Sequence, residues 1–214
     1  MARKTKLESL KTCELIVDSA EQLFSSKGFA QTTLHDVAEH AGLTRGAIYW
    51  HFKDKTALLD AVLARAQLPW DALPQRCDEI DRPLSVAQLA TFLAQCIETI
   101  IGDPRLHRVS LILLHTTELV EDNRRVQVRL TRTLERIGNF LAAMLGKAVD
   151  VPRAAVDRAA SAVKAMLTGV VYEALIEPNA VALGHLPVVL EHTLASCLAA
   201  PCVNPALSLA GPGG

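Results

Sequence analysis

The chain has 214 residues, of which 50% are hydrophobic and 21% are charged, and its formal net charge at pH 7 is -1. This composition excludes intrinsically disordered, collagen-like and low-complexity proteins, and it supports a well-filled core. Aromatic residues make up only 4% of the chain. Leu, Ala, Val and Ile must therefore fill the core, which favours packed helices over a β-sandwich.

Neither a membrane segment nor a metal centre is expected. No uninterrupted apolar run approaches the roughly 20 residues that span a bilayer, and the basic start at residues 1–6 lacks the apolar stretch of a secretory signal. The five cysteines have neither zinc spacing nor the pattern of a disulfide framework. We expect a cytoplasmic protein without a cofactor, with a cysteine redox sensor as the alternative to simple free thiols at Cys13, Cys77, Cys96, Cys197 and Cys202.

The first 70 residues predict four helices in succession. The first has apolar residues at helical spacing and ends at Lys27-Gly28, a cation in the last turn followed by glycine. Two short helices follow over 33–41 and 44–50, and a fourth runs from near 54 towards 69. Side chains that can cap the first turns of the two short helices stand at Thr33 with Asp36 and at Thr44.

The two short helices have the spacing of a helix-turn-helix over residues 34–53. Such a motif needs a small residue where its helices cross, and Ala38 supplies it. Four residues later the turn needs positive φ, which Gly42 allows, and six residues further on Ile48 fills the gap between the helices. The alternative is an ordinary pair of antiparallel helices in a bundle.

The outward face of the third helix argues against that alternative. It carries Arg, Tyr, Trp and His, whereas a solvated helix face usually carries Glu, Lys and Gln. Planar and hydroxyl donors of this kind suit base edges and phosphates. Lys55 lies in the first turn of the next helix, where the helix dipole disfavours a cation unless an anion is near. The face consists of Thr44, Arg45, Tyr49, Trp50 and His51.

The rest of the sequence predicts further helices. Breaks rich in Gly and Pro separate them, and no stretch alternates like a strand, so the expected fold class is all-α. We expect a DNA-binding domain over 1–53, a larger helical domain over 54–200 and a flexible tail over 201–214. The later helices are expected at roughly 84–101, 106–121, 123–146, 152–176 and 183–199.

Residues 10–60 resemble the TetR/AcrR family of repressors. The resemblance rests on two threonines before the motif, Ala41-Gly42 at its turn, a Gly-x-x-Tyr-x-His-Phe run over 46–52 and the lysine at 55. The start of the chain is further similar to AcrR-like repressors of multidrug efflux pumps. The resemblance implies a homodimer that binds a palindromic double-stranded DNA operator and is released by a small hydrophobic effector.

The resemblance also implies roles for single residues. Phosphate contacts would come from Thr33, Tyr49, His51 and Lys55. Base edges would be met by Thr44, Arg45, Gly46 and Ala47, and Trp50 would either touch DNA or pack. Phe52 is expected in the core. The basic arm that holds Arg3, Lys4 and Lys6 would follow the DNA backbone, reach into the minor groove or remain solvated.

The larger domain is expected to dimerise and to enclose the effector. The helices near 152–176 and 183–199 suit the dimer interface, and the first has a face of small apolar residues: Ala159, Ala160, Ala162, Val163, Ala165, Met166, Gly169 and Val170. An internal core helix of a monomer is the alternative. Candidate effector contacts, each of which could equally be core or surface, are Trp70, Phe92, Cys96, His115, Glu118 and Met144.

The sequence thus predicts a ligand-responsive repressor, with control of a multidrug efflux operon as the first choice. A regulator of a metabolic or other operon, or an activator, is the alternative. An enzyme is disfavoured because no paired carboxylates, Cys/His pair or phosphate-binding loop stands out. A nucleoid-type DNA binder would be far more basic than this chain.

Overall fold

The computed structural model describes residues 6–80, 82, 84–115, 124–148, 151–177 and 181–200. These residues form helices and connecting turns, with no strand among them, as the sequence predicts. The helices are α1 (Lys6–Lys27), α2 (Leu34–His40), α3 (Arg45–His51), α4 (Lys55–Arg65), the 3-10 turn η1 (Pro69–Ala72), α5 (Leu73–Glu79), α6 (Val86–Gly102), α7 (Pro104–His115), α8 (Arg124–Ala148), α9 (Arg153–Ile176), η3 (Leu183–His185) and α10 (Leu186–Ala199).

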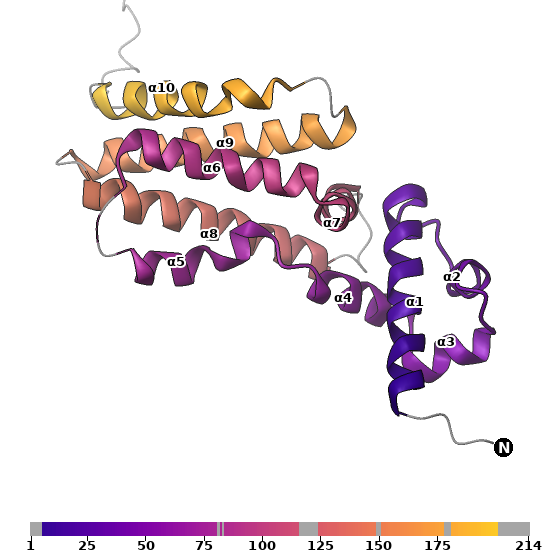
Figure 1. The fold of residues 1–214 in the computed structure, drawn as a ribbon. Coiled ribbons are helices and arrows are strands. Elements are labelled where there is room, and N and C mark those ends of the chain that lie inside the picture. The colour runs from indigo at the N-terminus through magenta and orange to yellow at the C-terminus, as the bar shows by residue number, and fades with distance from the viewer. Residues whose placement is uncertain are drawn as a thin grey trace, which may run out of the picture.

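The helices divide into a small head and a larger layered body (Figure 1). The head comprises α1, α2 and α3. In the body, α6 and α9 lie between α10 and α8, and α5 packs along the outer side of α8. Helix α4 leads from the head into the body, while α7 packs against α1. The two regions therefore meet at α1, α4 and α7.

The predicted fourth helix differs from the observed one. Helix α4 ends at Arg65, and η1 and α5 follow where the sequence analysis assigned no separate elements. Leu68 has extended backbone angles because the ring of Pro69 disfavours helical geometry in the residue before it. Pro69 and Pro74 each stand in the first turn of a new element, where a missing N–H costs nothing.

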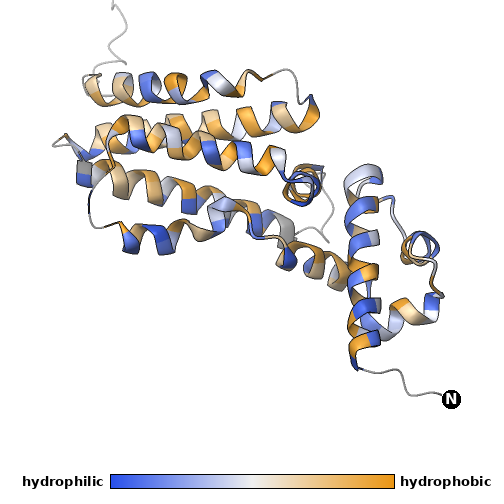
Figure 2. Cartoon of the chain, viewed as in Figure 1, coloured by the Kyte–Doolittle hydropathy of each residue, from blue (hydrophilic) through white to orange (hydrophobic). Residues whose placement is uncertain are grey.

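Helix α9 is the most apolar long helix of the described chain. An 18-residue window within it has a mean hydropathy of 1.4, which by length and composition would suffice to cross a bilayer, and 33% of that window is buried. A core helix of a soluble protein meets the same criteria, and α9 packs against both α8 and α10. Figure 2 shows the hydrophobic colouring that dominates α9 and α10.

Candidate DNA-binding face and apolar cavity

The helix-turn-helix folds as its three constrained positions predict. Ala38 and Ile48 are buried between the helices, with 2% and 0% of their surface exposed. Gly42 has φ of 64° in the turn, a region that side chains rarely adopt. The Leu43 amide donates to the carbonyl of Ala38 at 2.8 Å and closes the turn. These contacts hold α3 at a fixed angle to α2.

Side chains cap both helices at their N-termini. Thr33 and Asp36 form the predicted capping box: the Asp36 amide donates to Thr33 Oγ1 at 3.1 Å, and the Thr33 amide donates to Asp36 Oδ2 at 2.9 Å. The hydrogen bond from the Thr33 backbone amide lowers the pKa of the Asp36 carboxyl group. The Lys27 ammonium, 3.6 Å from that carboxyl group, lowers it further. The Ala47 amide donates to Thr44 Oγ1 at 3.3 Å and caps α3.

Helix α3 presents its polar face to solvent. Tyr49 is 51% exposed, and Trp50 is 82% exposed, so Trp50 does not pack within the chain. Arg45 and Gly46 are exposed on the same short helix, with Ala47 half-buried beside them. A Cβ built on Gly46 would meet no atom nearer than 3.9 Å. The face is therefore an open surface onto which another molecule can dock.

A groove lies between the N-terminus of α2 and the exposed side of α3. It brings together predicted phosphate contacts Thr33, Tyr49 and Lys55 with the predicted base contact Arg45. His51 lies half-buried at the end of α3, beside the buried Phe52. Three further groove residues were not among the predicted contacts, although they adjoin Thr33 in the sequence: Thr32, Leu34 and His35.

Lys55 has acceptors inside the head. Its ammonium donates to the carbonyls of Phe29 at 2.7 Å and Ala30 at 3.2 Å, and it lies 4.4 Å from the centre of the Phe29 ring. These contacts offset the unfavourable effect of the helix dipole on the Lys55 cation, so no nearby anion is needed to explain its position. They also fix the cation at the edge of the groove.

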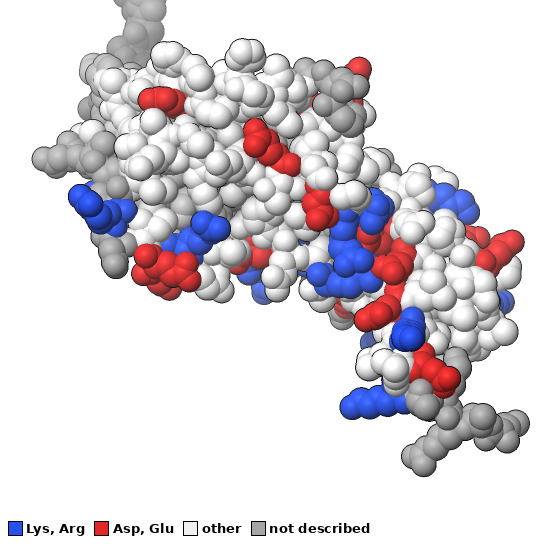
Figure 3. Space-filling model, in the orientation of Figure 1, with Lys and Arg blue, Asp and Glu red and all other residues white. Residues whose placement is uncertain are grey.

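An ionic cluster joins the head to the body. Glu21 of α1, only 1% exposed, accepts from Arg65 of α4 at 2.7 Å and from Arg108 of α7 at 2.8 Å, and Arg105 lies 3.5 Å away. Asp18 completes this junction cluster through Arg65 and Arg105. Figure 3 shows oppositely charged side chains gathered where the two regions meet.

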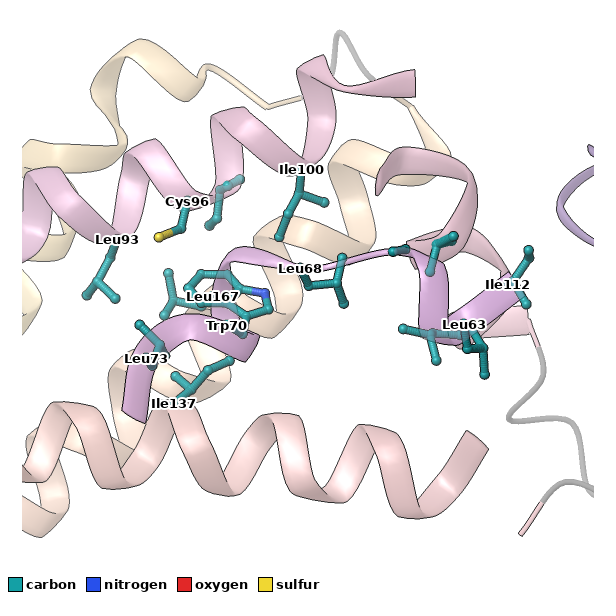
Figure 4. Close-up of a cluster of buried hydrophobic side chains, with 14 of the residues drawn as sticks. Leu63, Leu68, Trp70, Leu73, Leu93, Cys96, Ile100, Ile112, Ile137 and Leu167 are labelled. Atoms are coloured by element: carbon teal, nitrogen blue, oxygen red, sulfur yellow. The ribbon is translucent and has the colours of Figure 1, made fainter. Parts of the chain in front are cut away.

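The body contains an apolar cavity of about 80 Å³. Figure 4 shows Trp70 with Leu68, Ile100, Ile137 and Leu167, all of which line it. Ser110, Thr133 and Thr168 are the hydroxyl residues of its wall, and no charged residue lines it within the described chain. The remaining lining residues are Leu113, Leu114, Leu130, Leu134 and Val171.

The predicted effector residues are spread over several places. Trp70 lines the apolar cavity, whereas Phe92 and Cys96 line a neighbouring cleft, where the Arg76 guanidinium lies 5.1 Å from the Phe92 ring centre. Met144 is fully buried in the core, and His115 is exposed on α7. Glu118 lies outside the described residues. Most lining residues were missed because single leucines give no signal that separates a cavity wall from a core.

Comparisons with known proteins agree with this architecture. The family described as "Bacterial regulatory proteins, tetR family" matches residues 16–62. The "Probable HTH-type transcriptional regulator ArpR" of Pseudomonas putida is 33% identical over 185 residues, which cover 85% of this chain and 88% of that protein.

Two solved structures share the fold over most of both chains. The SmeT-triclosan complex has a TM-score of 0.70 and 30% identity, covering 87% of this chain and 91% of the other. NalD of Pseudomonas aeruginosa has a TM-score of 0.69 and 26% identity, covering 90% and 96%. It is described as the secondary repressor of the MexAB-OprM multidrug efflux pump. This chain belongs to the TetR family of bacterial regulatory proteins and is a DNA-binding transcriptional regulator, not an enzyme.

Proposed function

We propose that the protein is a cytoplasmic repressor that binds a palindromic operator as a homodimer and leaves it when a small hydrophobic effector fills the body. The exposed polar face of α3, held rigidly by Ala38, Gly42 and Ile48, carries this proposal. Control of a multidrug efflux operon is the first choice of target. It is supported by NalD and by SmeT of Stenotrophomonas maltophilia, both described as repressors of such pumps.

On the DNA, α3 would enter the major groove. Arg45, which is exposed on α3, would reach a base edge, and the small residues Gly46 and Ala47 would allow the backbone to approach. Thr44 would join these base contacts. Thr33, Tyr49, His51 and Lys55 would meet phosphates around the groove described above, and Trp50 would touch a sugar or a thymine methyl.

The dimer would form through α9 and α10. Large hydrophobic side chains are exposed on both helices: Tyr172 at 51%, Ile176 at 58%, Val188 at 57% and Val189 at 46%. Exposed apolar groups gathered in this way favour a protein interface.

The small-residue stripe of α9 supports this interface less than the sequence suggested. Ala159, Ala160 and Val163 are buried in the chain's own core, because small residues serve close packing within a chain as well as between chains. Ala165 and Gly169 are exposed, whereas Ala162, Met166 and Val170 are partly buried. The outer half of the stripe therefore remains available to a second copy.

Two connections would carry the signal from the cavity to the head. Helix α7 lines the cavity through Ser110, Leu113 and Leu114, and its other end holds Glu21 through Arg105 and Arg108. An engineered cavity of about 150 Å³ holds a benzene, so a ligand of that size bound wholly inside this cavity of about 80 Å³ would have to move its walls. Movement of α7 would then act directly on α1.

The second connection runs through α4. The Arg129 guanidinium of α8 donates to the carbonyls of Leu63 and Ala66 at the end of α4, and it pairs with Asp71 of η1 at 3.4 Å. Burial lowers the pKa of Arg129. Since η1 also contributes Trp70 to the cavity wall, a ligand there would disturb the anchor of α4. An effector that favours the displaced arrangement lowers operator affinity.

Selection from a random double-stranded DNA library, with the full-length chain as bait, tests the proposal. We expect enrichment of a palindrome whose half-sites are separated by a whole number of helical turns. At one fixed salt concentration, the enriched duplex should bind roughly a thousandfold or more tightly than a scrambled duplex. Absence of enrichment, or binding of an isolated half-site with full affinity, would contradict it.

A further inference from the structure

Thr133 of α8 has a buried hydroxyl group without a hydrogen-bond partner. The residue is 8% exposed and lines the apolar cavity. A buried hydroxyl that gives up its water hydrogen bonds without replacing them is unfavourable, so such groups are rare in folded proteins. A molecule that reaches Thr133 with a hydrogen-bonding atom would remove this deficit.

Other threonines in the same structure show what the hydroxyl normally does. The hydroxyls of five helical threonines donate to the carbonyl four residues earlier, at 2.8 to 2.9 Å: Thr12, Thr91, Thr99, Thr168 and Thr193. Thr168 is the closest comparison, because it lines the same cavity and its hydroxyl is already bonded to Lys164. Thr133 differs from it in two respects, because Thr168 is exposed and has its hydroxyl bonded, whereas Thr133 is buried with its hydroxyl unused.

The remainder of the described wall is uncharged. It is made mainly of aliphatic side chains and Trp70, with Ser110 and Thr168 as the other hydroxyl residues. A charged ligand would lose its hydration here without meeting an opposite charge among these residues, which is costly. An uncharged apolar ligand gives up little favourable hydration when it enters the cavity.

We propose that the effector is an uncharged, mainly apolar molecule, such as a phenol or an aromatic ketone, whose single polar atom hydrogen-bonds to the Thr133 hydroxyl. The inference rests on the proposed role of this cavity as the effector site. It adds the chemical class of the ligand and the residue that selects it.

Probes of nearly constant shape test this selection. Equilibrium dialysis of the full-length protein, read by the ultraviolet absorbance of each probe, gives the dissociation constants of 1-naphthol, naphthalene and the cation N-methylquinolinium. One hydrogen bond corresponds to a preference of about three- to tenfold for 1-naphthol over naphthalene. The cation should bind at least about a hundredfold more weakly than 1-naphthol.

Three variants test whether the preference for 1-naphthol over naphthalene depends on the Thr133 hydroxyl. In Thr133→Val, which keeps the shape, the preference for 1-naphthol should fall below about twofold, while naphthalene binds at least as well as before. Thr133→Ser keeps the hydroxyl group and should therefore show the wild-type preference for 1-naphthol over naphthalene. Thr168→Val is the matched control and should retain the wild-type preference, because its hydroxyl is already bonded.

The outcomes separate this inference from the proposed function. An unchanged preference in Thr133→Val, or tighter binding of the cation, overturns the inference while leaving operator binding intact. If neither naphthalene nor 1-naphthol binds, the cavity is not an apolar ligand site and the inference also fails. Because dialysis uses no DNA, failure to recognise an operator would not affect these results.

Discussion

The head and the body both carry a candidate site, but they build it in opposite ways. The groove of the head is lined by residues 32–35, 45, 49 and 55, a stretch of fewer than 30 residues. The cavity of the body draws its wall from residues between Leu68 and Val171. A site made from one short segment can be read along the chain, whereas a site made from distant helices requires their packing.

The two tryptophans of the chain show the same contrast. Trp50 is 82% exposed on α3, and Trp70 is 5% exposed against the cavity. The ring of Trp50 is therefore open to a partner outside the chain, whereas the ring of Trp70 is buried beside a small apolar cavity. Exposure, which the residue type does not reveal, separates a docking surface from a cavity wall.

The largest expected effect concerns the boundary between the two regions. Glu21→Gln should lower the free energy of unfolding by about 3–5 kcal/mol, because it removes the buried charge that Arg65 and Arg108 surround. Urea denaturation followed by circular dichroism measures it. Glu14→Gln, on the exposed side of α1, is the control and should change little. A loss below about 1 kcal/mol for Glu21→Gln would mean that the junction cluster does not hold the regions together.

Arg45→Ala should affect the head alone. We expect operator affinity to fall by about 1–3 kcal/mol, with relaxed specificity at one base pair, and stability to remain unchanged because Arg45 is exposed. Fluorescence anisotropy with the enriched and scrambled duplexes measures both quantities. Lys53→Ala, just beyond α3, is the comparison and should weaken both duplexes equally if it acts only on phosphates. Unchanged affinities for Arg45→Ala would remove this residue from the interface.

The helix-turn-helix contains two glycines for comparison, Gly42 in the turn and Gly46 within α3. Gly42→Ala should destabilise the protein by about 1–2 kcal/mol, since the φ of 64° is unfavourable for alanine, although its Cβ would meet no atom within 4 Å. Gly46→Ala, within α3, should instead raise stability by about 0.5–1 kcal/mol. Thermal unfolding compares them. Equal effects would show that the turn tolerates any residue.

The smallest effect expected is chemical and lies in the body. Burial raises the pKa of the Cys96 thiol to about 11, so at pH 8 roughly one molecule in a thousand carries the reactive thiolate. Cys96 should therefore resist iodoacetamide at pH 8 in the folded protein and react readily in urea, as peptide mass spectrometry can follow. Rapid labelling of the folded protein would revive the redox-sensor alternative.

Prediction from sequence succeeded where local chemistry decides the structure. The capping box at Thr33 and Asp36, the turn at Gly42 and the buried plug at Ile48 each depend on neighbours within a few residues. The helices of the body were also foreseen, with boundaries displaced by a few residues, except that residues 116–121 of the helix predicted at 106–121 lie outside the described residues. The separate η1 and α5 were not foreseen, because elements of four and seven residues are too short for a helical period to show in the sequence.

The contacts between distant helices could not be predicted in this way. In the sequence, Glu21 looks like any other acidic residue of an amphipathic helix. Only the packing of α4 and α7 against α1 places Arg65 and Arg108 beside its carboxylate. Thr133 resembles any helical threonine until its packing leaves the hydroxyl unpaired. Such residues obtain their role from tertiary packing, which no local pattern encodes.

The dependence of the head on the body is tested most directly by operator affinity with the cavity empty and filled. Anisotropy of the enriched duplex should be titrated with full-length protein, without and with saturating 1-naphthol, at one salt concentration. If filling the cavity moves α7 and the anchor of α4, the dissociation constant should rise at least about tenfold, a coupling of about 1.4 kcal/mol. An unchanged dissociation constant, while dialysis shows the probe bound, would contradict coupling between the two regions.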